Sequence, residues 1–213
     1  MISLKNVSKS YNDFSINIEQ CVFEKGTLTC VYGKNGSGKT TLFKIIAGIT
    51  NFERGHVYID NMDIKKSSGW KKSISTFLGD EYLLDFLNKK EYLDFYINSY
   101  NKEYKEPLIT DTFLNYLYQS LPKVKFIREY SKGNKAKLGI LATLLSDTKI
   151  MIFDEPFANL DKETQVNLSN YLNKLKLNKT IVLATHHKEI ISNYCDGFIE
   201  IEGEKLLFQS NRI

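Results

Sequence analysis

The chain has 213 residues, 42% of them hydrophobic and 25% charged, which suits one domain with a full core. Its net charge of +4 is mild for a nucleic-acid binder, and no apolar run approaches the roughly 18 residues that span a bilayer. The start of the chain lacks the apolar core of a secretion signal, and three widely spaced cysteines show no metal-ligand pattern, so we expect buried free thiols in a reducing cytoplasm.

Residues 2–7 and 14–19 alternate loosely in polarity, which predicts two strands of an antiparallel sheet. A short β-rich run at 28–32 follows, and apolar residues then recur at helical spacing over 40–49. Between them lies a glycine-rich loop that fits G-x-x-x-x-G-K-[ST]: Gly33, Lys34, Asn35, Gly36, Ser37, Gly38, Lys39, Thr40 and Thr41. Such a loop cradles phosphates at a helix N-terminus and its lysine reaches the β and γ oxygens, so we expect a bound nucleoside triphosphate.

Two further strands are predicted at 55–60 and 74–78, the second leading into the loop Gly79-Asp80-Glu81. The character of the chain then changes, because residues 89–128 are rich in Tyr, Leu, Lys and Asn at helical spacing. Pro107 and Pro122 interrupt this pattern, so helices should end near them. We therefore expect a helical subdomain, about 80–146, inserted in a nucleotide-binding fold.

The last third of the chain predicts more of a parallel sheet. A long helix is predicted to begin near Ser131, and the runs 150–153 and 180–184 are continuously apolar, as in strands buried on both faces. Asp161 is placed to cap the helix between these strands. Residues 198–208 are predicted to form a hairpin that turns at Gly203.

An acidic pair, Asp154 and Glu155, directly follows the buried strand 150–153. One carboxylate at such a strand end can hold Mg²⁺, and the second can orient and deprotonate a water at the γ-phosphate. The string apolar-Asp-Glu-Pro is common by chance. It gains weight here because it follows a phosphate loop on a separate predicted strand.

With these motifs the chain resembles an ATP-binding-cassette (ABC) ATPase, the nucleotide-binding subunit of ABC transporters, over nearly its whole length. Four further elements match the family in order. They are Tyr130-Ser131-Lys132-Gly133-Asn134 in the place of the signature L-S-G-G-Q, Asn159-Leu160-Asp161 after the acidic pair, Thr185-His186 after a buried strand, and Tyr11 near the N-terminus. The resemblance implies an α/β fold: a P-loop core with an N-terminal antiparallel sheet and an inserted helical subdomain, all in one domain, 1–213.

The resemblance also implies a role for each matching residue. Lys39 neutralises phosphate charge, Thr40 and Asp154 hold Mg²⁺, Glu155 is the general base, His186 contacts the γ-phosphate and Tyr11 stacks on adenine. In this family two cassettes dimerise head to tail and bury two ATP molecules, so Ser131 and Gly133 act on the partner's ATP. Taken alone, Tyr11 could be a packed aromatic and His186 a satisfied surface or core histidine, although its place after a buried strand favours the functional role. The neighbouring His187 has no role in any motif.

Two departures from the family pattern stand out. Lys132 and Asn134 replace a glycine and a glutamine of the signature. The loop Gly79-Asp80-Glu81 lacks the glutamine with which the family contacts Mg²⁺ and senses the membrane partner. Either Asp80 takes that place as a metal-side ligand, or the contact is absent.

The resemblance implies Mg²⁺-dependent ATP hydrolysis that powers a separate transmembrane permease subunit. The cassette would be a homodimer, cytoplasmic and peripheral on the inner face of the cell membrane, with no nucleic-acid partner. It is most similar to bacterial single-cassette exporters of drugs or antimicrobial peptides. The alternative is an ABC-type ATPase acting on a soluble macromolecule, although such relatives typically have two cassettes or a coiled-coil insertion. A GTP-binding switch would need N-K-x-D, and Asn173-Lys174-Leu175-Lys176 lacks the aspartate.

Overall fold

A computed structural model describes residues 1–11, 14–100, 109–186, 188–202 and 205–210. The strands are β1 (Ile2–Tyr11), β2 (Phe14–Phe23), β3 (Thr27–Tyr32), β4 (Arg54–Ile59), β5 (Met62–Asp63), β6 (Ile74–Phe77), β7 (Ile150–Asp154), β8 (Thr180–Ala184), β9 (Gly197–Glu202) and β10 (Lys205–Ser210). The α-helices are α1 (Lys39–Ile46), α2 (Lys89–Asn98), α3 (Thr112–Ser120), α4 (Lys132–Leu145), α5 (Lys162–Leu175) and α6 (Lys188–Tyr194).

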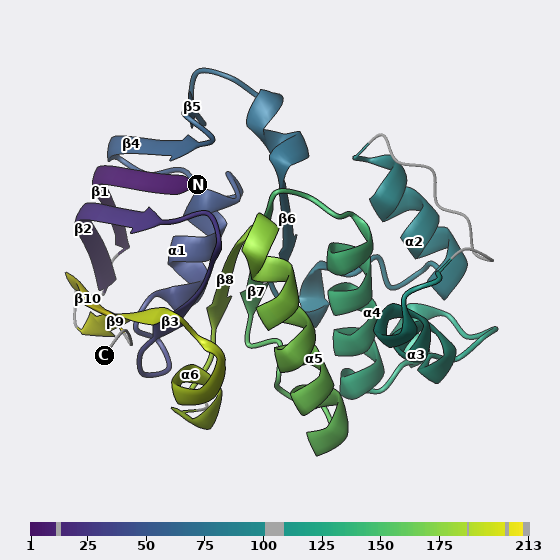
Figure 1. Ribbon diagram of the computed structural model, residues 1–213. Helices are drawn as coiled ribbons and strands as arrows, with labels where there is room; N and C mark the ends of the chain where they lie inside the picture. The colour runs from purple at the N-terminus through teal and green to yellow at the C-terminus, as the bar shows by residue number, and fades with distance from the viewer. Residues whose placement is uncertain (12–13, 101–108, 187, 203–204, 211–213) are drawn as a thin grey trace.

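Two sheets organise these elements (Figure 1). The first has the order β2-β1-β4-β5 and is antiparallel. The second has the order β10-β9-β3-β8-β7-β6, in which β9, β3, β8, β7 and β6 run parallel. The non-consecutive order places β3, which leads into the phosphate loop, next to β8 and one strand away from β7.

Helix α1 lies between the two sheets, and the core has one layer on each face of the parallel sheet. The side chains of β7 belong to both layers. Ile150 and Ile152 pack with α1 and the antiparallel sheet, whereas Met151 and Phe153 pack with the helices on the other face. Successive side chains of a strand point to opposite faces, and here both faces are covered. The continuously apolar sequence of this strand is thus explained by burial on both sides.

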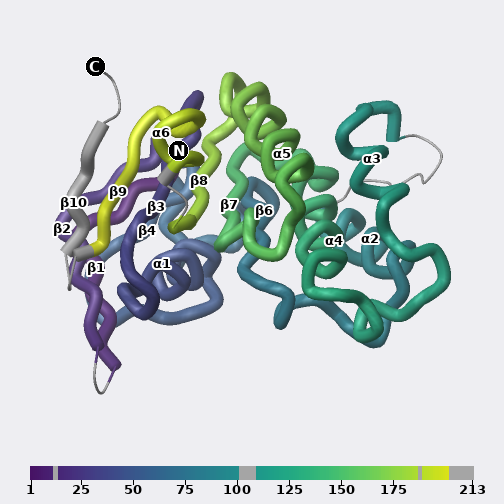
Figure 2. Tube along the Cα trace, turned by 90° about the horizontal axis from the view of Figure 1, so that it is seen from below, coloured from purple at the N-terminus to yellow at the C-terminus, as the bar shows by residue number. Residues whose placement is uncertain are grey.

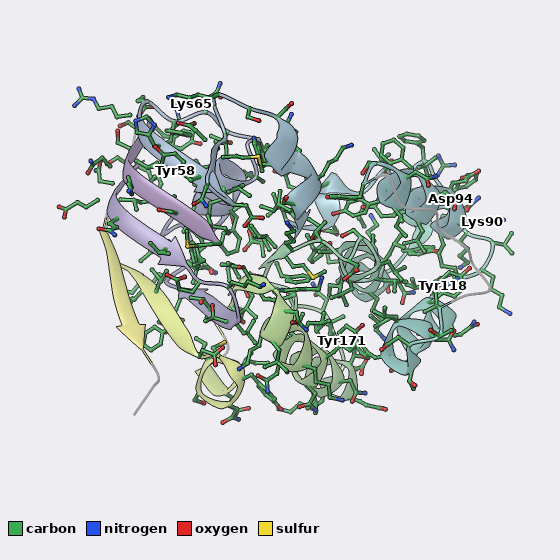
Figure 3. All side chains as sticks on the ribbon, turned by 45° about the horizontal axis from the view of Figure 1, so that its top comes forward. Tyr58, Lys65, Lys90, Asp94, Tyr118 and Tyr171 are labelled. Atoms are coloured by element: carbon green, nitrogen blue, oxygen red, sulfur yellow. The ribbon has the colours of Figure 1, made fainter. Side chains whose placement is uncertain are left out.

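Helices α2, α3 and α4 form the end of the molecule opposite the antiparallel sheet (Figure 2). In Figure 3 Tyr118, Lys90 and Asp94 lie at this helical end, while Tyr58 and Lys65 lie at the other. The Tyr96 hydroxyl joins α2 to the edge strand β6, donating to the Thr76 carbonyl (3.0 Å) and accepting from its N–H (3.3 Å). This contact satisfies backbone groups that an edge strand leaves unpaired.

Side chains at the helix starts fix where these helices begin. The Asn88 side chain and Glu91 form a capping box at α2, and Asp111 caps α3. Ser131 caps α4, and Asp161 caps α5 by accepting from the Thr164 N–H at 2.8 Å. The predicted cap at Asp161 and the predicted helix start near Ser131 are therefore confirmed.

The strands predicted at 2–7 and 14–19 are confirmed as parts of β1 and β2 in one antiparallel sheet, as are the parallel strands at 150–153 and 180–184. The three cysteines are free and buried, as expected. Gly203, Pro107 and His187 lie outside the described residues. No helix in the described part of the chain combines the length and apolar character needed to cross a membrane.

Candidate functional site

The phosphate loop predicted from the sequence turns between β3 and α1. Gly36 and Gly38 have φ of +80° and +104°, a region that only glycine adopts readily. The buried Lys39 side chain folds back along the loop, and its Nζ donates to the carbonyls of Gly33 (2.8 Å) and Lys34 (3.1 Å). The loop thus joins an ammonium group to the unpaired N–H groups of a helix N-terminus, a setting that favours an anion.

A cavity of about 440 Å³ opens beside this loop. Its lining comes from four parts of the chain: Phe14; Asn35, Gly36, Gly38, Lys39, Thr40 and Thr41; Leu78 and Gly79; and Asp154 and Glu155. The carboxyl ends of parallel strands meet at one edge of a sheet, which is where α/β folds bind ligands. The fold therefore brings the loop and the acidic pair into one cavity.

The hydroxyl of Thr40 and the carboxylate of Asp154 are in direct contact. Thr40 Oγ1 donates to Asp154 Oδ2 at 2.5 Å, from the first turn of α1 to the last residue of β7. Burial raises the pKa of the Asp154 carboxyl, while this hydrogen bond lowers it. The pair is a partly buried set of oxygen atoms, and both residues line the cavity.

Glu155 is held in an uncommon backbone conformation, with φ of +46°. Its N–H donates to the carbonyl of Ala184, the last residue of β8, at 3.0 Å. Two residues beyond Ala184, His186 Nδ1 lies 3.0 Å from Glu155 Oε2. Strained conformations of this kind gather at functional sites, and here the strain directs a carboxylate at a histidine.

These residues fit a magnesium nucleotide. Among the described residues there is no group of three or more His, Cys, Asp or Glu that could hold a metal ion. Thr40 and Asp154 offer two oxygen ligands, and Mg²⁺ commonly takes only one or two protein ligands alongside phosphate oxygens and waters. The donor set suits Mg²⁺ carried on phosphates better than a fully protein-bound metal.

The loop after β6 carries two neighbouring acids, Asp80 and Glu81. Gly79 lines the cavity and Asp80 is not among its lining residues. The carboxylate of Glu81 instead lies against Gly79, so close that a Cβ at this glycine would overlap it. Its charge also contributes, after burial, to the raised pKa of Asp154. Like Asp80, Glu81 is not among the residues that line the cavity, and the sequence did not single it out.

Tyr11 is placed differently from the other candidates. It is 47% exposed and is not among the residues that line the cavity, whereas Phe14 is. Lys9 Nζ lies 5.0 Å from the centre of the Tyr11 ring. No sequence motif identifies Phe14, since its contact with the loop depends on the tertiary structure.

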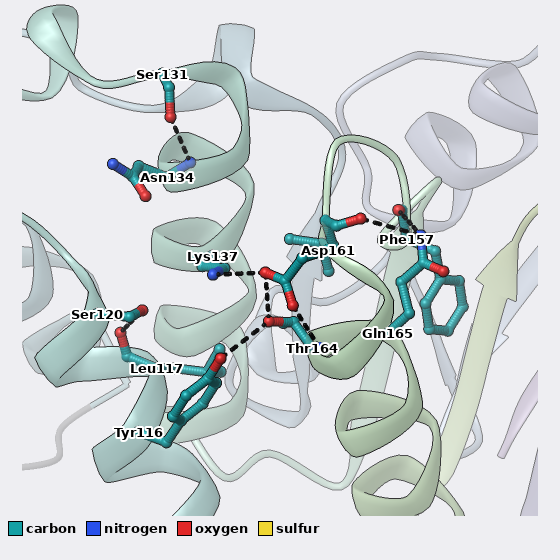
Figure 4. Close-up of polar contacts among 11 residues, drawn as sticks. Tyr116, Leu117, Ser120, Ser131, Asn134, Lys137, Phe157, Asp161, Thr164 and Gln165 are labelled. Carbon is teal, nitrogen blue, oxygen red and sulfur yellow. Dashed lines mark hydrogen bonds and ion pairs between the residues drawn. The ribbon is translucent and has the colours of Figure 1, made fainter.

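The signature residues lie on a separate element, the start of α4. Ser131 is exposed and accepts from the Asn134 N–H at 3.3 Å, and neither it nor Gly133 lines the cavity. A Cβ at Gly133 would lie 2.7 Å from the Asn159 carbonyl oxygen, so the signature touches the segment after the acidic pair. Figure 4 shows Lys137 of α4 contacting Asp161 in that segment, at 3.0 Å.

A second cavity of about 510 Å³ lies between α5 and α6. It is lined by Lys162, Gln165, Val166, Ser169, His186, Glu189, Ile190, Asn193 and Tyr194. His186 thus has the acidic pair on one side and this second cavity on the other. Lys162 Nζ and Glu189 Oε2 at its rim lie 3.6 Å apart, and both side chains are mostly exposed.

Comparisons with known proteins agree with this geometry. The profile of the family described as "ABC transporter" matches residues 17–158. ABC transporter ATP-binding protein NatA of Bacillus subtilis is 29% identical over 96% of this chain and 83% of its own length. Phosphonates import ATP-binding protein PhnC of Fusobacterium nucleatum is 25% identical over 98% and 91%. The ATP-binding cassette MJ0796, solved as a dimer in a post-hydrolysis state with ADP and Pi, shares the fold with a TM-score of 0.85 at 23% identity, covering 100% of both chains.

Proposed function

Since the chain belongs to the ABC transporter family and is an ATP-binding, ATP-hydrolysing subunit of that family, we propose that it drives a separate transmembrane permease by Mg²⁺-dependent hydrolysis. One observation carries the proposal: a single cavity is lined both by the phosphate loop and by the acidic pair. We also propose that residues 1–213 are one domain, with the helical subdomain of about 80–146 inserted in it.

The phosphate-binding half of the site consists of residues already in place. Lys39 exchanges the carbonyls of Gly33 and Lys34 for phosphate oxygens, and the N–H groups at the start of α1 bind the remaining ones. Thr40 and Asp154 are the ligands offered to Mg²⁺. When bound, this ion supplies charge stabilisation at the phosphate oxygens.

The hydrolytic half consists of Glu155 and His186. Glu155 is the general base that takes the proton of the attacking water, and its fixed backbone directs its carboxylate along the cavity wall. His186, at 3.0 Å, holds that carboxylate in place and lies where it can reach the γ-phosphate. Ion pairing and hydrogen bonding of this kind pre-position a base before the reaction.

The site is completed by a second copy of the chain, arranged head to tail. Ser131 and Gly133 are at the N-terminus of the fourteen-residue helix α4, away from the cavity of their own chain, and Ser131 is exposed. An exposed helix N-terminus suits the γ-phosphate of a nucleotide held by the partner. The dimeric MJ0796 cassette, which has the same fold, supports such an assembly.

The permease docks on the helical subdomain. Apolar side chains there are unusually exposed: Phe86 (61%), Phe95 (59%), Val124 (90%) and Phe126 (43%). Phe86 and Phe126 come from two segments joined by hydrogen bonds, including Ile127 N–H to Leu87 carbonyl at 2.9 Å. We propose that the exposed apolar side chains of these two neighbouring segments receive an apolar segment of the permease at the inner face of the membrane.

We propose no direction of transport. The phosphonates import protein PhnC matches 98% of this chain, so the similarity does not favour export over import. An ATPase acting on a soluble macromolecule remains the alternative function. Co-purification with a membrane protein when the chain is expressed with its neighbouring genes supports the permease. Loss of that complex in Phe86→Ser, with ATPase activity unchanged, locates the docking surface. A stable complex with a soluble macromolecule instead would favour the alternative.

The hydrolytic mechanism is tested by Glu155→Gln. Removing the base should lower turnover by about 10²–10⁴-fold while ATP affinity is kept, and ATP should then trap a dimer visible by light scattering. The matched control is Glu163→Gln, the same change at an exposed position in the first turn of α5. Near-normal phosphate release by Glu155→Gln would remove this residue from the mechanism.

A further inference from the structure

Two aromatic residues form the end of the β1–β2 hairpin. Tyr11 and Phe14 are directly paired in the register of these strands. Their rings are stacked, with centroids 6.4 Å apart and an angle of 29° between the planes. Only the first of them is identified by any sequence motif.

Phe14 packs on the phosphate loop itself. A Cβ at Gly38 would lie 2.6 Å from Phe14 Cζ, so this ring occupies the space beside a glycine that must also adopt a φ of +104°. Gly38 directly precedes the first residue of α1. The Phe14 ring therefore lines the cavity between the N–H groups at the start of α1 and the β1–β2 hairpin.

The three features follow one another in space: the loop, then Phe14 against the loop, then Tyr11 stacked on Phe14 and exposed to solvent. A nucleoside triphosphate has the same order of parts, which is phosphates, sugar and base. We propose that Phe14 packs against the sugar of the bound nucleotide, between phosphates held by the loop and a base held by Tyr11. This inference rests on the proposed nucleotide site and adds a residue to it.

The chemistry of the Phe14 side chain determines which part of the nucleotide it can recognise. A phenyl ring has neither a hydrogen-bond donor nor an acceptor, so it recognises the apolar face of the sugar and not the 2′-hydroxyl. The contact therefore does not distinguish ribose from deoxyribose. It also does not depend on the identity of the base.

The experiment compares three ligands that grow by one part at a time: tripolyphosphate, ribose 5′-triphosphate and ATP, each with Mg²⁺, titrated by calorimetry. Phe14→Ala should leave the affinity for tripolyphosphate unchanged and lower the affinities for ribose 5′-triphosphate and ATP by the same factor, about tenfold. Tyr11→Ala should lower the affinity for ATP alone. The affinity for deoxy-ATP should fall in Phe14→Ala by the same factor as the affinity for ATP.

The control is Tyr58→Ala, which removes an aromatic stacked on His56 (centroids 5.9 Å apart) in the same antiparallel sheet, away from the cavity. It should bind all three ligands normally. Phe14→Leu keeps an apolar contact and should recover most of the affinity, which separates a lost contact from a misfolded hairpin.

Two results would overturn the inference. If Phe14→Ala and Phe14→Leu weaken tripolyphosphate as much as ATP, Phe14 supports the loop and does not touch the sugar. If Phe14→Ala weakens ATP but not ribose 5′-triphosphate, it contacts the base. Failure of the proposed site itself is recognised separately, because Lys39→Ala would then still bind tripolyphosphate.

Discussion

At the scale of single residues, the neighbours of Asp154 change the pKa of its carboxyl. Desolvation by burial raises this pKa, and the charges of Glu155 and Glu81 raise it further, whereas the hydrogen bond from Thr40 lowers it. A cation bound at this carboxylate would relieve the repulsion among these three acids. We therefore predict that Glu81, whose charge acts on Asp154, contributes to binding the cation.

The first prediction tests this contribution by titrating Mg²⁺. Glu81→Ala should raise the Mg²⁺ concentration that gives half-maximal ATP hydrolysis by about tenfold, the lower end of the effect of outer-shell metal partners. Asp80→Ala, the adjacent acid, is the control and should leave the titration unchanged. Mg²⁺-dependent binding of ATP, measured without turnover, should shift in parallel. A shift caused by Asp80→Ala alone would instead support Asp80 as the metal-side ligand.

At the scale of elements, helix α4 is held unusually close to the parallel sheet. Gly139 faces the ring of Phe77 on β6, and a Cβ at this position would overlap that ring and approach Leu83. All three residues are buried, so the ring has little room to move aside. This packing places the signature at the start of α4 relative to the loop that follows β6.

The second prediction is that Gly139→Ala destabilises the protein. Helix propensity alone would favour alanine by about 1 kcal/mol, whereas overpacking a core costs about 1–3 kcal/mol. We expect a net loss of about 1 kcal/mol in the free energy of unfolding, measured by urea denaturation. The control is Gly69→Ala, where the nearest atom would lie 3.5 Å from the new Cβ. A gain in stability at Gly139 would show that the ring yields freely.

At the scale of the whole molecule, the two halves of the proposed site lie on different elements of one chain. The phosphate loop and acidic pair share a cavity, while Ser131 is exposed at the start of α4 and outside that cavity. Lys137 and Asp161 join α4 to the segment after the acidic pair at 3.0 Å. A chain can therefore complete its partner's site only if the two copies face each other head to tail.

The third prediction uses two inactive variants to test this assembly. Lys39→Ala destroys the site that a chain builds on its own loop, and Ser131→Arg destroys the site that it completes for its partner. Each homodimer should be nearly inactive. Mixing equal amounts forms heterodimers in which both lesions fall in one site. With random pairing half of the dimers are heterodimers with one intact site of two, so ATP hydrolysis should return to about a quarter of the wild-type rate.

The same mixture discriminates against a chain that works alone. A fully active Ser131→Arg variant, with turnover proportional to the first power of chain concentration, would contradict the head-to-tail arrangement. Ser120→Arg, on α3 and outside the proposed interface residues, is the matched control for the added charge. It should be active without a partner variant.

The sequence alone determined the features that depend on neighbours along the chain. Such local patterns are the glycine-rich loop at 33–41, the helix start near Ser131, the cap at Asp161, and the uninterrupted apolar strands β7 and β8. These patterns were sufficient to predict the α/β fold, the phosphate loop and the acidic pair. Family resemblance supplied the roles of Tyr11 and His186.

Only the tertiary structure decided which distant residues touch. The order β3-β8-β7 brings Thr40 to Asp154 and His186 to Glu155, and a hairpin places Phe14 against Gly38. The turn after β6 brings the carboxylate of Glu81 against Gly79. Local periodicity carries no information about such contacts, because they arise from the packing of a strand or loop against elements far away in the sequence.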